Sequence, residues 1–517
     1  MQLDKIFWVR LSLVVFGRYE EEPFTSRMAA GGLPWSRSSQ KCSGESAVRA
    51  WMAKNLVYRP TTWMRGEPVF RILARYEESQ WWSPERLQAH QADGVTRLLR
   101  YAANRTPHYR QVAHDLGIEP KSLCAEDLKL FPKLQKQDLV DNSVQLQAFR
   151  LPGTTSWKTT GGSTGVAVRL RKNRWATAAE QAASWRSYRW YGVHPGQRQA
   201  RFWGTPLSGR TRLRARAIDW VLNRSRFSAF AFTPADLNRY FGELLQTRPD
   251  WAYGYVSMLV QFARHCLDNG LPLPDLGLRC VVTTSEVLTE PDRALIQRAF
   301  GAPVFNEYGC GEVGAVLYEC PEGSLHAMAE NLLLELVPDA TEQEPDACSL
   351  LVTDLHNRAT PLIRYEIGDR VVPAPPCRCG RALPAFRKIF GRAYDFIETE
   401  DGTRYHGEFF MYMLESARDQ GAPILQAQFE QESPRSLRIN LVPREGYEPA
   451  VGEALSEQIE RASEGRLSCQ IAVVPELVRE NSGKLRLIRS LAPERANSMQ
   501  AMGRIAPGDA PRHEVKQ

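Results

Sequence analysis

The sequence contains a loop of small residues that suits an anion. Residues 159–165 read TTGGSTG, with three glycines and four hydroxyl side chains. Glycines let neighbouring backbone N–H groups turn toward one point, and hydroxyls add donors, so such a loop can hold phosphate. It is not the motif G-x-x-x-x-G-K-[ST], because Val166 follows Gly165 and no lysine lies beside it. A flexible turn is the alternative interpretation. If the loop does hold phosphate, a distant lysine must complete the site.

A second glycine motif, GCGEVG at 309–314, matches the dinucleotide-binding pattern G-x-G-x-x-G. That fingerprint requires a helix after the glycines, whereas the residues that follow, AVLYE, have the pattern of a strand. Read instead as NEYGCGE at 306–312, the segment offers the ring of Tyr308 for stacking on a nucleobase and the carboxylate of Glu312 for Mg²⁺. A strand that ends in a plain turn is the alternative.

Three further charged residues follow glycines or glycine turns. Asp369 ends the run LIRYEIGD, at an expected strand end, where it suits ribose hydroxyls. Arg392 in GRAYD offers a cation, and Lys484 lies on the glycine turn of RENSGKLR. A single exposed lysine is usually only a solvated charge. Here it can supply the cation that the 159–165 loop lacks.

Three thiols and an imidazole have the composition of a structural zinc site. Cys320 and His326 form C-x5-H, and Cys377 and Cys379 form C-x-C within a proline- and glycine-flanked segment. A Cys₃His set is typical of closed, tetrahedral zinc sites, although these spacings are not those of a standard zinc finger. Four reduced side chains near strand ends are the alternative. A zinc ion here would tie the loop after Glu312 to the segment that precedes residue 391.

The aromatic side chains of PDWAYGYVSM are candidates for a substrate pocket. Trp251, Tyr253 and Tyr255 alternate along this run and could line a pocket for an aryl group. Aromatic residues at this spacing are more often ordinary core or surface packing, so both interpretations stay open.

Size and composition limit the class of protein. A chain of 517 residues predicts two or three domains, and 43% hydrophobic residues suffice for real cores. A net charge of +7 over this length does not indicate nucleic-acid binding. Ten scattered cysteines favour a reducing cytoplasm. The apolar run Ile6–Phe16 has eleven residues and contains Arg10, too short to span a bilayer, so we expect no integral membrane segment.

The elements that must position these residues alternate between helix and strand. Residues 83–115 and 175–190 have helical patterns, the first beginning with a Ser-Pro-Glu start signal. Between 197 and 336, strand-like runs at 280–283, 303–305 and 332–337 alternate with helical segments such as 291–300, and 349–354 is a further strand. The pattern predicts a mixed α/β architecture.

Composition also predicts domain boundaries. A proline-rich break at 373–384 leads to residues with their own strand and helix signals, at 436–442 and 451–462. We expect an N-terminal extension of unknown role at 1–56, a large domain of several subdomains at 57–390, a small mobile lid domain at 391–496, and a disordered tail at 497–517. We find no internal repeat.

Taken together, the motifs resemble those of the adenylate-forming superfamily of acyl-CoA synthetases, adenylation domains and luciferases. TTGGSTG, NEYGCGE, RYEIGD, GRAYD and NSGK occur in that family's order and rough spacing across residues 159–486. The segments NRTPHYR at 104–110, PLIRYEIGDR and CRCGR make the chain most similar to the phenylacetate–CoA ligase branch, including its capsule-biosynthesis relatives. The resemblance covers about residues 80–495.

The resemblance implies carboxylate activation by ATP and Mg²⁺ through an acyl-AMP. Lys484, Glu312 and Thr164 would be catalytic, with Glu312 holding Mg²⁺, and Asp395 would be the hinge of the lid domain. The resemblance assigns ATP binding to Thr159, Thr160, Gly161, Gly162, Ser163, Thr164, Gly165, Ser285, Glu286, Asn306, Glu307, Tyr308, Gly309, Asp369 and Arg392. It also raises the expectation of zinc at the Cys₃His set.

The sequence leaves the acceptor and the acid open. The resemblance implies coenzyme A as acceptor, an amine is the alternative, and an aryl or related carboxylic acid is the expected substrate. A nicotinamide oxidoreductase that uses GCGEVG and a nucleotide-binding scaffold without activity are the readings from other classes. Lys484 and Glu312 argue against the scaffold. The oligomeric state stays open, with a homodimer as one expectation.

Overall fold

The computed structural model describes residues 44–149, 151, 153, 155–160, 168–203, 218–220, 222–228, 233–339, 345–390, 396–401, 403–477 and 487–489. Several of the predicted functional residues therefore lie outside the described residues: the loop 161–165, Arg392, Asp395 and Lys484. The same holds for the apolar run Ile6–Phe16 and for the expected tail at 497–517.

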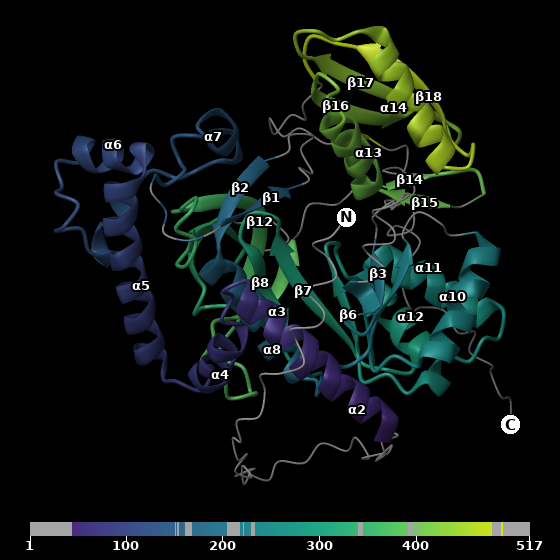
Figure 1. Ribbon diagram of the computed structural model, residues 1–517, viewed down its shortest axis with the longest axis horizontal. Helices are drawn as coiled ribbons and strands as arrows, with labels where there is room; N and C mark the ends of the chain where they lie inside the picture. Colours follow the sequence, from purple (N-terminus) through teal and green to yellow (C-terminus); the bar gives the residue numbers. More distant parts are fainter. Residues whose placement is uncertain are drawn as a thin grey trace, which may run out of the picture. The chain divides into compact units, whose positions relative to one another are not determined.

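Eleven strands of the described part form one mixed sheet, in the order β10-β11-β12-β13-β9-β8-β7-β6-β5-β3-β4. Figure 1 labels β12, β8, β7, β6 and β3 of this sheet. Five neighbouring strands are parallel: β4 (Arg224–Ser228), β3 (Gln199–Trp203), β5 (Trp251–Tyr255), β6 (Val281–Thr284) and β7 (Val304–Cys310). The other strands pair antiparallel: β8 (Gly314–Glu319), β9 (Leu325–Ala327), β13 (Ala385–Phe390), β12 (Tyr365–Pro373), β11 (Cys348–Asp354) and β10 (Leu332–Pro338). The sheet changes from parallel to antiparallel between β7 and β8.

Helices cover both faces of the parallel strands. One face packs in a core with α10 (Pro234–Thr247), α11 (Val256–Asp268) and α12 (Glu290–Phe300). The other packs in a core with α4 (Val69–Ser79) and α8 (Arg174–Arg189). Side chains alternate between the two cores along a strand, as Ala252 and Tyr253 do on β5. The predicted α/β fold class is confirmed, and the expected strands at 280–283, 303–305, 332–337 and 349–354 correspond to β6, β7, β10 and β11.

The N-terminal described residues are mostly helical. They form α2 (Gly44–Met52), a π-helical turn (Ala53–Tyr58), α3 (Arg59–Met64), α5 (Pro84–Arg105), α6 (Pro107–Asp115), a 3₁₀ turn (Ala125–Leu130), α7 (Lys136–Asp141) and the hairpin of β1 (Thr155–Thr160) with β2 (Val168–Asn173). The helix expected over 83–115 is interrupted at Thr106. Proline disfavours the helical conformation of the residue before it, and Thr106 is extended, with its hydroxyl accepting from the Tyr109 N–H as the cap of α6.

Residues 396–489 contain a second, smaller set of elements. These are β14 (Phe396–Glu398) paired with β15 (Arg404–His406), then α13 (Gly407–Asp419), β16 (Ile424–Gln431), β17 (Ser436–Pro443), α14 (Pro449–Ala462), β18 (Ser468–Val473) and β19 (Ile488–Arg489). Their four-stranded sheet has the order β18-β17-β16-β19, and their side chains share one core. The strand at 436–442 and the helix at 451–462 match β17 and α14. The domain boundaries themselves stay a prediction.

In the part of the chain that the structure describes, no helix is both long enough and apolar enough to cross a bilayer.

Candidate active site

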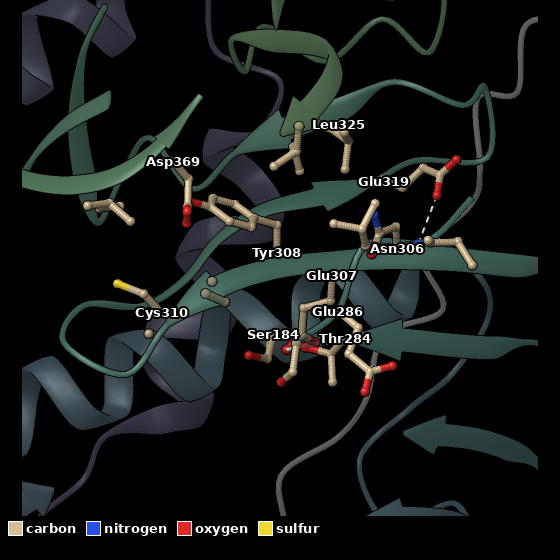
Figure 2. A pocket seen from close by; sticks show the side chains of 18 of the residues that line it. Ser184, Thr284, Glu286, Asn306, Glu307, Tyr308, Cys310, Glu319, Leu325 and Asp369 are labelled. Atoms are coloured by element: carbon tan, nitrogen blue, oxygen red, sulfur yellow. Dashed lines mark hydrogen bonds between the residues drawn. The ribbon is translucent and has the colours of Figure 1, made fainter. Parts of the chain in front are cut away.

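A cavity of about 960 Å³ opens where β6 and β7 end (Figure 2). Ligands in α/β sheets bind beyond the carboxyl ends of parallel strands, so this is the expected place for a site. The cavity brings together every predicted ATP-binding or catalytic residue whose side chain the structure describes. These are Ser285, Glu286, Asn306, Glu307, Tyr308, Glu312 and Asp369, and Gly309 lies among them.

Tyr308 and Asp369 meet across the cavity wall from two separate strands. Tyr308 on β7 donates a 2.8 Å hydrogen bond from its hydroxyl to Asp369 Oδ2 on β12. Figure 2 shows the ring directed at the carboxylate. The bond holds an aromatic ring and a carboxylate side by side. A nucleoside can bind both, because its base stacks on a ring and its ribose hydroxyls donate to a carboxylate.

Glu312 occupies the turn between β7 and β8. Its side chain is 8% exposed, and Lys136 Nζ, at the start of α7, lies 4.0 Å from Glu312 Oε1. A carboxylate is a hard oxygen ligand of the kind that Mg²⁺ prefers. Because Glu312 and Lys136 both line the cavity, they present one anion and one cation to whatever binds there.

Two of the three glycines of GCGEVG are explained by close contacts that leave no room for a side chain. A Cβ at Gly309 would lie 2.4 Å from the carbonyl oxygen of Gly314, where the β7–β8 register shifts. Gly314 has φ +90°, and a Cβ there would lie 2.4 Å from Glu180 Cδ. Strand β8 begins at Gly314 itself. Because the dinucleotide fingerprint needs a helix at that point, the oxidoreductase reading fails.

Glu180 on α8 lies between two lysines that the sequence analysis did not single out. Its two oxygens lie 2.9 Å from Lys158 Nζ and 2.8 Å from Lys172 Nζ. Although burial alone would raise it, the ammonium groups of Lys172 and Lys158 lower the pKa of Glu180 to about 2. Glu180 and Lys158 line the cavity. Lys158 lies on β1, directly before the predicted anion loop, so it is a cation close to that loop along the chain.

Glu307 is a half-buried carboxyl held by phenols. Its oxygens accept from the Tyr188 hydroxyl at 2.7 Å, the Tyr253 hydroxyl at 3.0 Å and Thr284 Oγ1 at 3.4 Å. Burial raises the pKa of Glu307 above its ordinary value, while these hydrogen bonds oppose the shift. The three donors fix the Glu307 side chain in the wall of the cavity.

The two residues after β6, Ser285 and Glu286, have different structural roles. Ser285 has φ +66°, a left-handed conformation that non-glycine residues adopt rarely and that is found at functional sites. Glu286 accepts hydrogen bonds from the Ser257 backbone N–H and, at 2.8 Å, from Ser257 Oγ in the first turn of α11. A carboxylate there complements the positive end of the helix, so Glu286 anchors the wall of the cavity to α11.

Of the predicted aromatic substrate residues, only Tyr253 lines the cavity. Trp251 is 1% exposed and packs against Tyr188, and Tyr255 is 2% exposed within the core beside α11. Strand β5 lies between two helix layers, which is why its aromatic residues are mostly core. We therefore do not retain Trp251 and Tyr255 as substrate contacts.

The four predicted zinc-binding residues lie together. The ligand atoms of Cys320, His326, Cys377 and Cys379 are all within 4.8 Å of one another. Cys320 Sγ lies 3.6 Å from Cys377 Sγ, and Cys379 Sγ lies 3.3 Å from His326 Nε2. His326 Nδ1 lies 3.1 Å from the Leu383 carbonyl oxygen, the second-shell contact that orients a metal-binding imidazole.

Known proteins with similar sequences include ligases of carboxylic acids. No model of a protein family matches the chain. The chain is 24% identical over 312 residues to protein CapK of Staphylococcus aureus, covering 59% of this chain and 67% of CapK. It is 29% identical over 333 residues to a phenylacetate–coenzyme A ligase of Thermus thermophilus, covering 60% and 72%, and 27% identical over 338 residues to that of Pseudomonas putida, covering 61% and 72%. The chain is a homologue of phenylacetate–coenzyme A ligases and CapK.

The fold of this ligase homologue agrees with that relationship. A solved structure of 2-hydroxyisobutyryl-CoA ligase, in complex with 2-HIB-AMP and CoA, matches with a TM-score of 0.53 at 18% identity, covering 82% of this chain and 96% of the other. At that identity the match shows the acyl-CoA ligase fold. The resemblance inferred from the five sequence motifs is thus confirmed, whereas the role of each site residue remains a proposal.

Proposed function

We propose that the protein is an AMP-forming carboxylic acid–CoA ligase. The observation that carries this proposal is the cavity at the end of β7, where Tyr308, Asp369 and Glu312 come together in a homologue of phenylacetate–coenzyme A ligases. The reactants are ATP with Mg²⁺, a carboxylic acid and coenzyme A, and the products are the acyl-CoA, AMP and pyrophosphate.

In the first step, a carboxylate oxygen of the acid attacks the α-phosphorus of ATP. The bond between the α-phosphorus and the bridging oxygen to the β-phosphorus breaks, and pyrophosphate leaves with that electron pair. Acid and nucleotide are both anions, so positioning and neutralisation of charge must supply most of the catalysis.

Tyr308 and Asp369 hold the nucleoside. The Tyr308 ring packs on adenine, and Asp369, oriented by the Tyr308 hydroxyl, accepts hydrogen bonds from the ribose. Arg392 adds a cation to the ribose side. Glu312, which lines the cavity, would hold Mg²⁺, and the ion would neutralise the phosphates.

The loop 159–165 holds the β- and γ-phosphates, and Lys484 bridges the acid carboxylate and the α-phosphate. Lys158 precedes the loop on β1 and gives this end of the cavity a further positive charge. Loss of one preorganised charge at such a site typically costs about 10²–10³ in rate.

In the second step, the thiolate of coenzyme A attacks the acyl carbon, and AMP leaves with the electron pair of the acyl–oxygen bond. Between the two steps, the lid domain at 391–496 rotates about Asp395. Lys484 thereby leaves the site, and the thiol of coenzyme A can enter. Such gating motions commonly separate the steps of a reaction.

The Cys₃His cluster fits a structural zinc ion. Three sulfurs and one imidazole nitrogen within 4.8 Å of one another match the donor set and spacing of a tetrahedral site, and the four protein ligands leave no open position for catalysis. Zinc would join the β8–β9 hairpin, through Cys320 after β8 and His326 on β9, to the segment before β13. The nine described cysteines are all free, which fits a reducing cytoplasm, where we place the protein.

The test is pyrophosphate release from Mg·ATP with a panel of aryl and aliphatic acids, with and without coenzyme A. Wild type is compared with Lys484→Ala and Glu312→Gln, and each variant is expected to lose about 10²–10³ in kcat. Arg435→Gln, at an exposed salt bridge with Glu400, is the matched control and should keep full activity. Absence of acid-dependent pyrophosphate release by wild type would contradict the proposal, and release that requires an amine in place of coenzyme A would change the acceptor.

A further inference from the structure

Arg201 is the charged residue of β3, a strand with a helix-covered face on each side. Strand β3 reads QARFW, and its neighbours are β4 and β5, with Arg201 opposite Arg226 on one side and Tyr253 on the other. Ala200 and Phe202 point into the core beside α11. Arg201 and Trp203 point to the other face and line the cavity. Strands of parallel sheets covered on both faces are normally hydrophobic throughout, so an inward arginine calls for a reason.

The Arg201 guanidinium lies beside two aromatic rings. Its Cζ lies 4.6 Å from the centre of the Trp203 ring and 5.1 Å from that of Tyr253. These cation–π contacts hold the group next to the two rings.

Within the described residues, no acceptor meets the N–H groups of Arg201. The structure shows no ion pair or hydrogen bond of Arg201, and its Nε is a buried donor without a partner. Two carboxyl groups of this region have other hydrogen-bonding or ion-pair partners. Glu307 accepts from Tyr188 and Tyr253, and Asp219 lies 2.9 Å from Arg226 Nη2 and 3.8 Å from Arg224 Nη1.

Two further arginines lie on β4, the strand beside Arg201. Arg201, Arg224 and Arg226 belong to adjacent strands, and Asp219 is the carboxylate that pairs with the last two. Burial, and after it the charge of Arg201, lowers the pKa of Arg224 to about 10. A buried N–H without an acceptor is costly, and a bound anion that accepts from Arg201 Nε would remove that cost.

The end of the cavity formed by Arg201 differs from the nucleotide end. Tyr308, Asp369 and Glu312 lie on β7, β12 and the turn after β7, whereas Arg201, Trp203 and Tyr253 lie on β3 and β5, two and more strands further along the sheet. The residues at the β3–β5 end are aromatic apart from Arg201. They suit the part of the acid that lies away from its reacting carboxylate.

We infer that the preferred substrate is a carboxylic acid with a second anionic group at its far end, and that this group binds the edge of the Arg201 guanidinium. This inference rests on the proposed function. A guanidinium edge offers two parallel N–H donors to a carboxylate, which gives both affinity and orientation. The rings of Trp203 and Tyr253 cover the apolar body of the acid, and recognition at Arg201 sets which carboxylate is presented to ATP.

Matched pairs of acids test the inference. The pairs are phenylacetate with 4-carboxyphenylacetate, and hexanoate with adipate; 4-(aminomethyl)phenylacetate reverses the charge at the far end. Binding is measured by isothermal titration calorimetry and turnover by pyrophosphate release, for wild type, Arg201→Met and Arg201→Lys. Arg110→Met, which removes a cation–π arginine stacked 5.1 Å from the Phe149 ring, is the matched control.

Wild type and Arg110→Met are expected to bind the dianionic member of each pair at least tenfold more tightly. Arg201→Met should lose that preference and keep its affinity for the monoacid, and Arg201→Lys should keep part of it. Tighter binding of the monoacids by wild type, or an unchanged preference in Arg201→Met, overturns the inference. Absence of pyrophosphate release with every acid would contradict the proposed function. The calorimetry would still decide the inference, because it measures binding without turnover.

Discussion

The Tyr308 hydroxyl donates a 2.8 Å hydrogen bond to Asp369 Oδ2 across 61 positions of sequence. It connects the last parallel strand, β7, to β12 in the antiparallel part of the sheet. Two motifs that are separate in the sequence thereby form one wall of the cavity. The proposed nucleoside site depends on this contact because it orients the carboxylate that would meet the ribose.

Replacement of Tyr308 by phenylalanine keeps the ring and removes this hydrogen bond. A hydrogen bond to a charged group contributes about 1.5–3 kcal/mol, so the KM for ATP should rise about tenfold or more while the KM for the acid changes little. Steady-state pyrophosphate release measures both constants. Tyr109→Phe is the control, since it removes a buried hydroxyl that donates to the Pro361 carbonyl outside the cavity. An equal effect of both variants on the KM for ATP would contradict the nucleoside role.

The Glu180 ion pairs predict a dependence of stability on pH. The folded-state pKa of about 2 lies below the ordinary 4.5. The stabilisation by the carboxylate is therefore fully present above about pH 4.5 and is lost as the pH falls toward 2. Glu180→Gln should lower the free energy of unfolding by about 3 kcal/mol at neutral pH, because it leaves the 3% exposed Lys172 without its counter-ion.

Urea titrations of wild type and Glu180→Gln at neutral pH and at successively lower pH measure this effect. The difference between the two proteins should be constant above about pH 5 and shrink below it. A difference that grows as the pH falls would mean that the Glu180 pKa is not depressed.

Comparing Gly314 with Gly270 distinguishes two reasons for a glycine: a positive φ and a lack of space for a side chain. Both have positive φ, but a Cβ at Gly314 would meet Glu180, whereas nothing lies within 4 Å of a Cβ at Gly270. Gly270→Ala should cost about 1–2 kcal/mol from backbone strain alone. Gly314→Ala should cost a further 1–3 kcal/mol, roughly, for the displaced side chain. Thermal and urea unfolding compare them, and equal losses would show that the contact with Glu180 does not constrain residue 314.

The Cys₃His cluster predicts a stoichiometric metal ion. Protein purified without chelator should contain about one zinc per chain by elemental mass spectrometry, with four protein ligands. Cys377→Ser and Cys379→Ser should each lose the metal and lower the melting temperature. Cys124→Ser, at a half-buried thiol that the cluster does not include, is the control. The zinc site would be contradicted if wild type contained no zinc and the Cys377→Ser and Cys379→Ser variants melted at the same temperature as wild type.

Much of this architecture was predictable because the signals are local. Strands β6, β10 and β11 and helix α12 follow from apolar periodicity bounded by turn residues, and the grouping of Cys320, His326, Cys377 and Cys379 follows from ligand type. The interruption at Thr106 also has a local cause, the proline at 107, which a helical pattern over 83–115 overlooks.

The interpretations that failed, and the residues that were missed, depend on pairing between strands. Alternation placed Trp251, Tyr253 and Tyr255 together, but it cannot show that helices cover both faces of β5 and leave only Tyr253 on the cavity. Lys158 and Lys172 acquire their meaning from Glu180, which lies on another element. The position of Arg201 between the apolar residues Ala200 and Phe202 was a signal in the sequence that could have singled it out.

The most direct test of the central claim follows an oxygen atom. The acid is labelled with ¹⁸O in its reacting carboxylate and incubated with Mg·ATP and coenzyme A, and the products are analysed by mass spectrometry. If a carboxylate oxygen attacks the α-phosphorus, AMP receives one ¹⁸O and the acyl-CoA keeps the other. Formation of ADP with labelled inorganic phosphate, or of AMP without label, would contradict activation through an acyl-AMP.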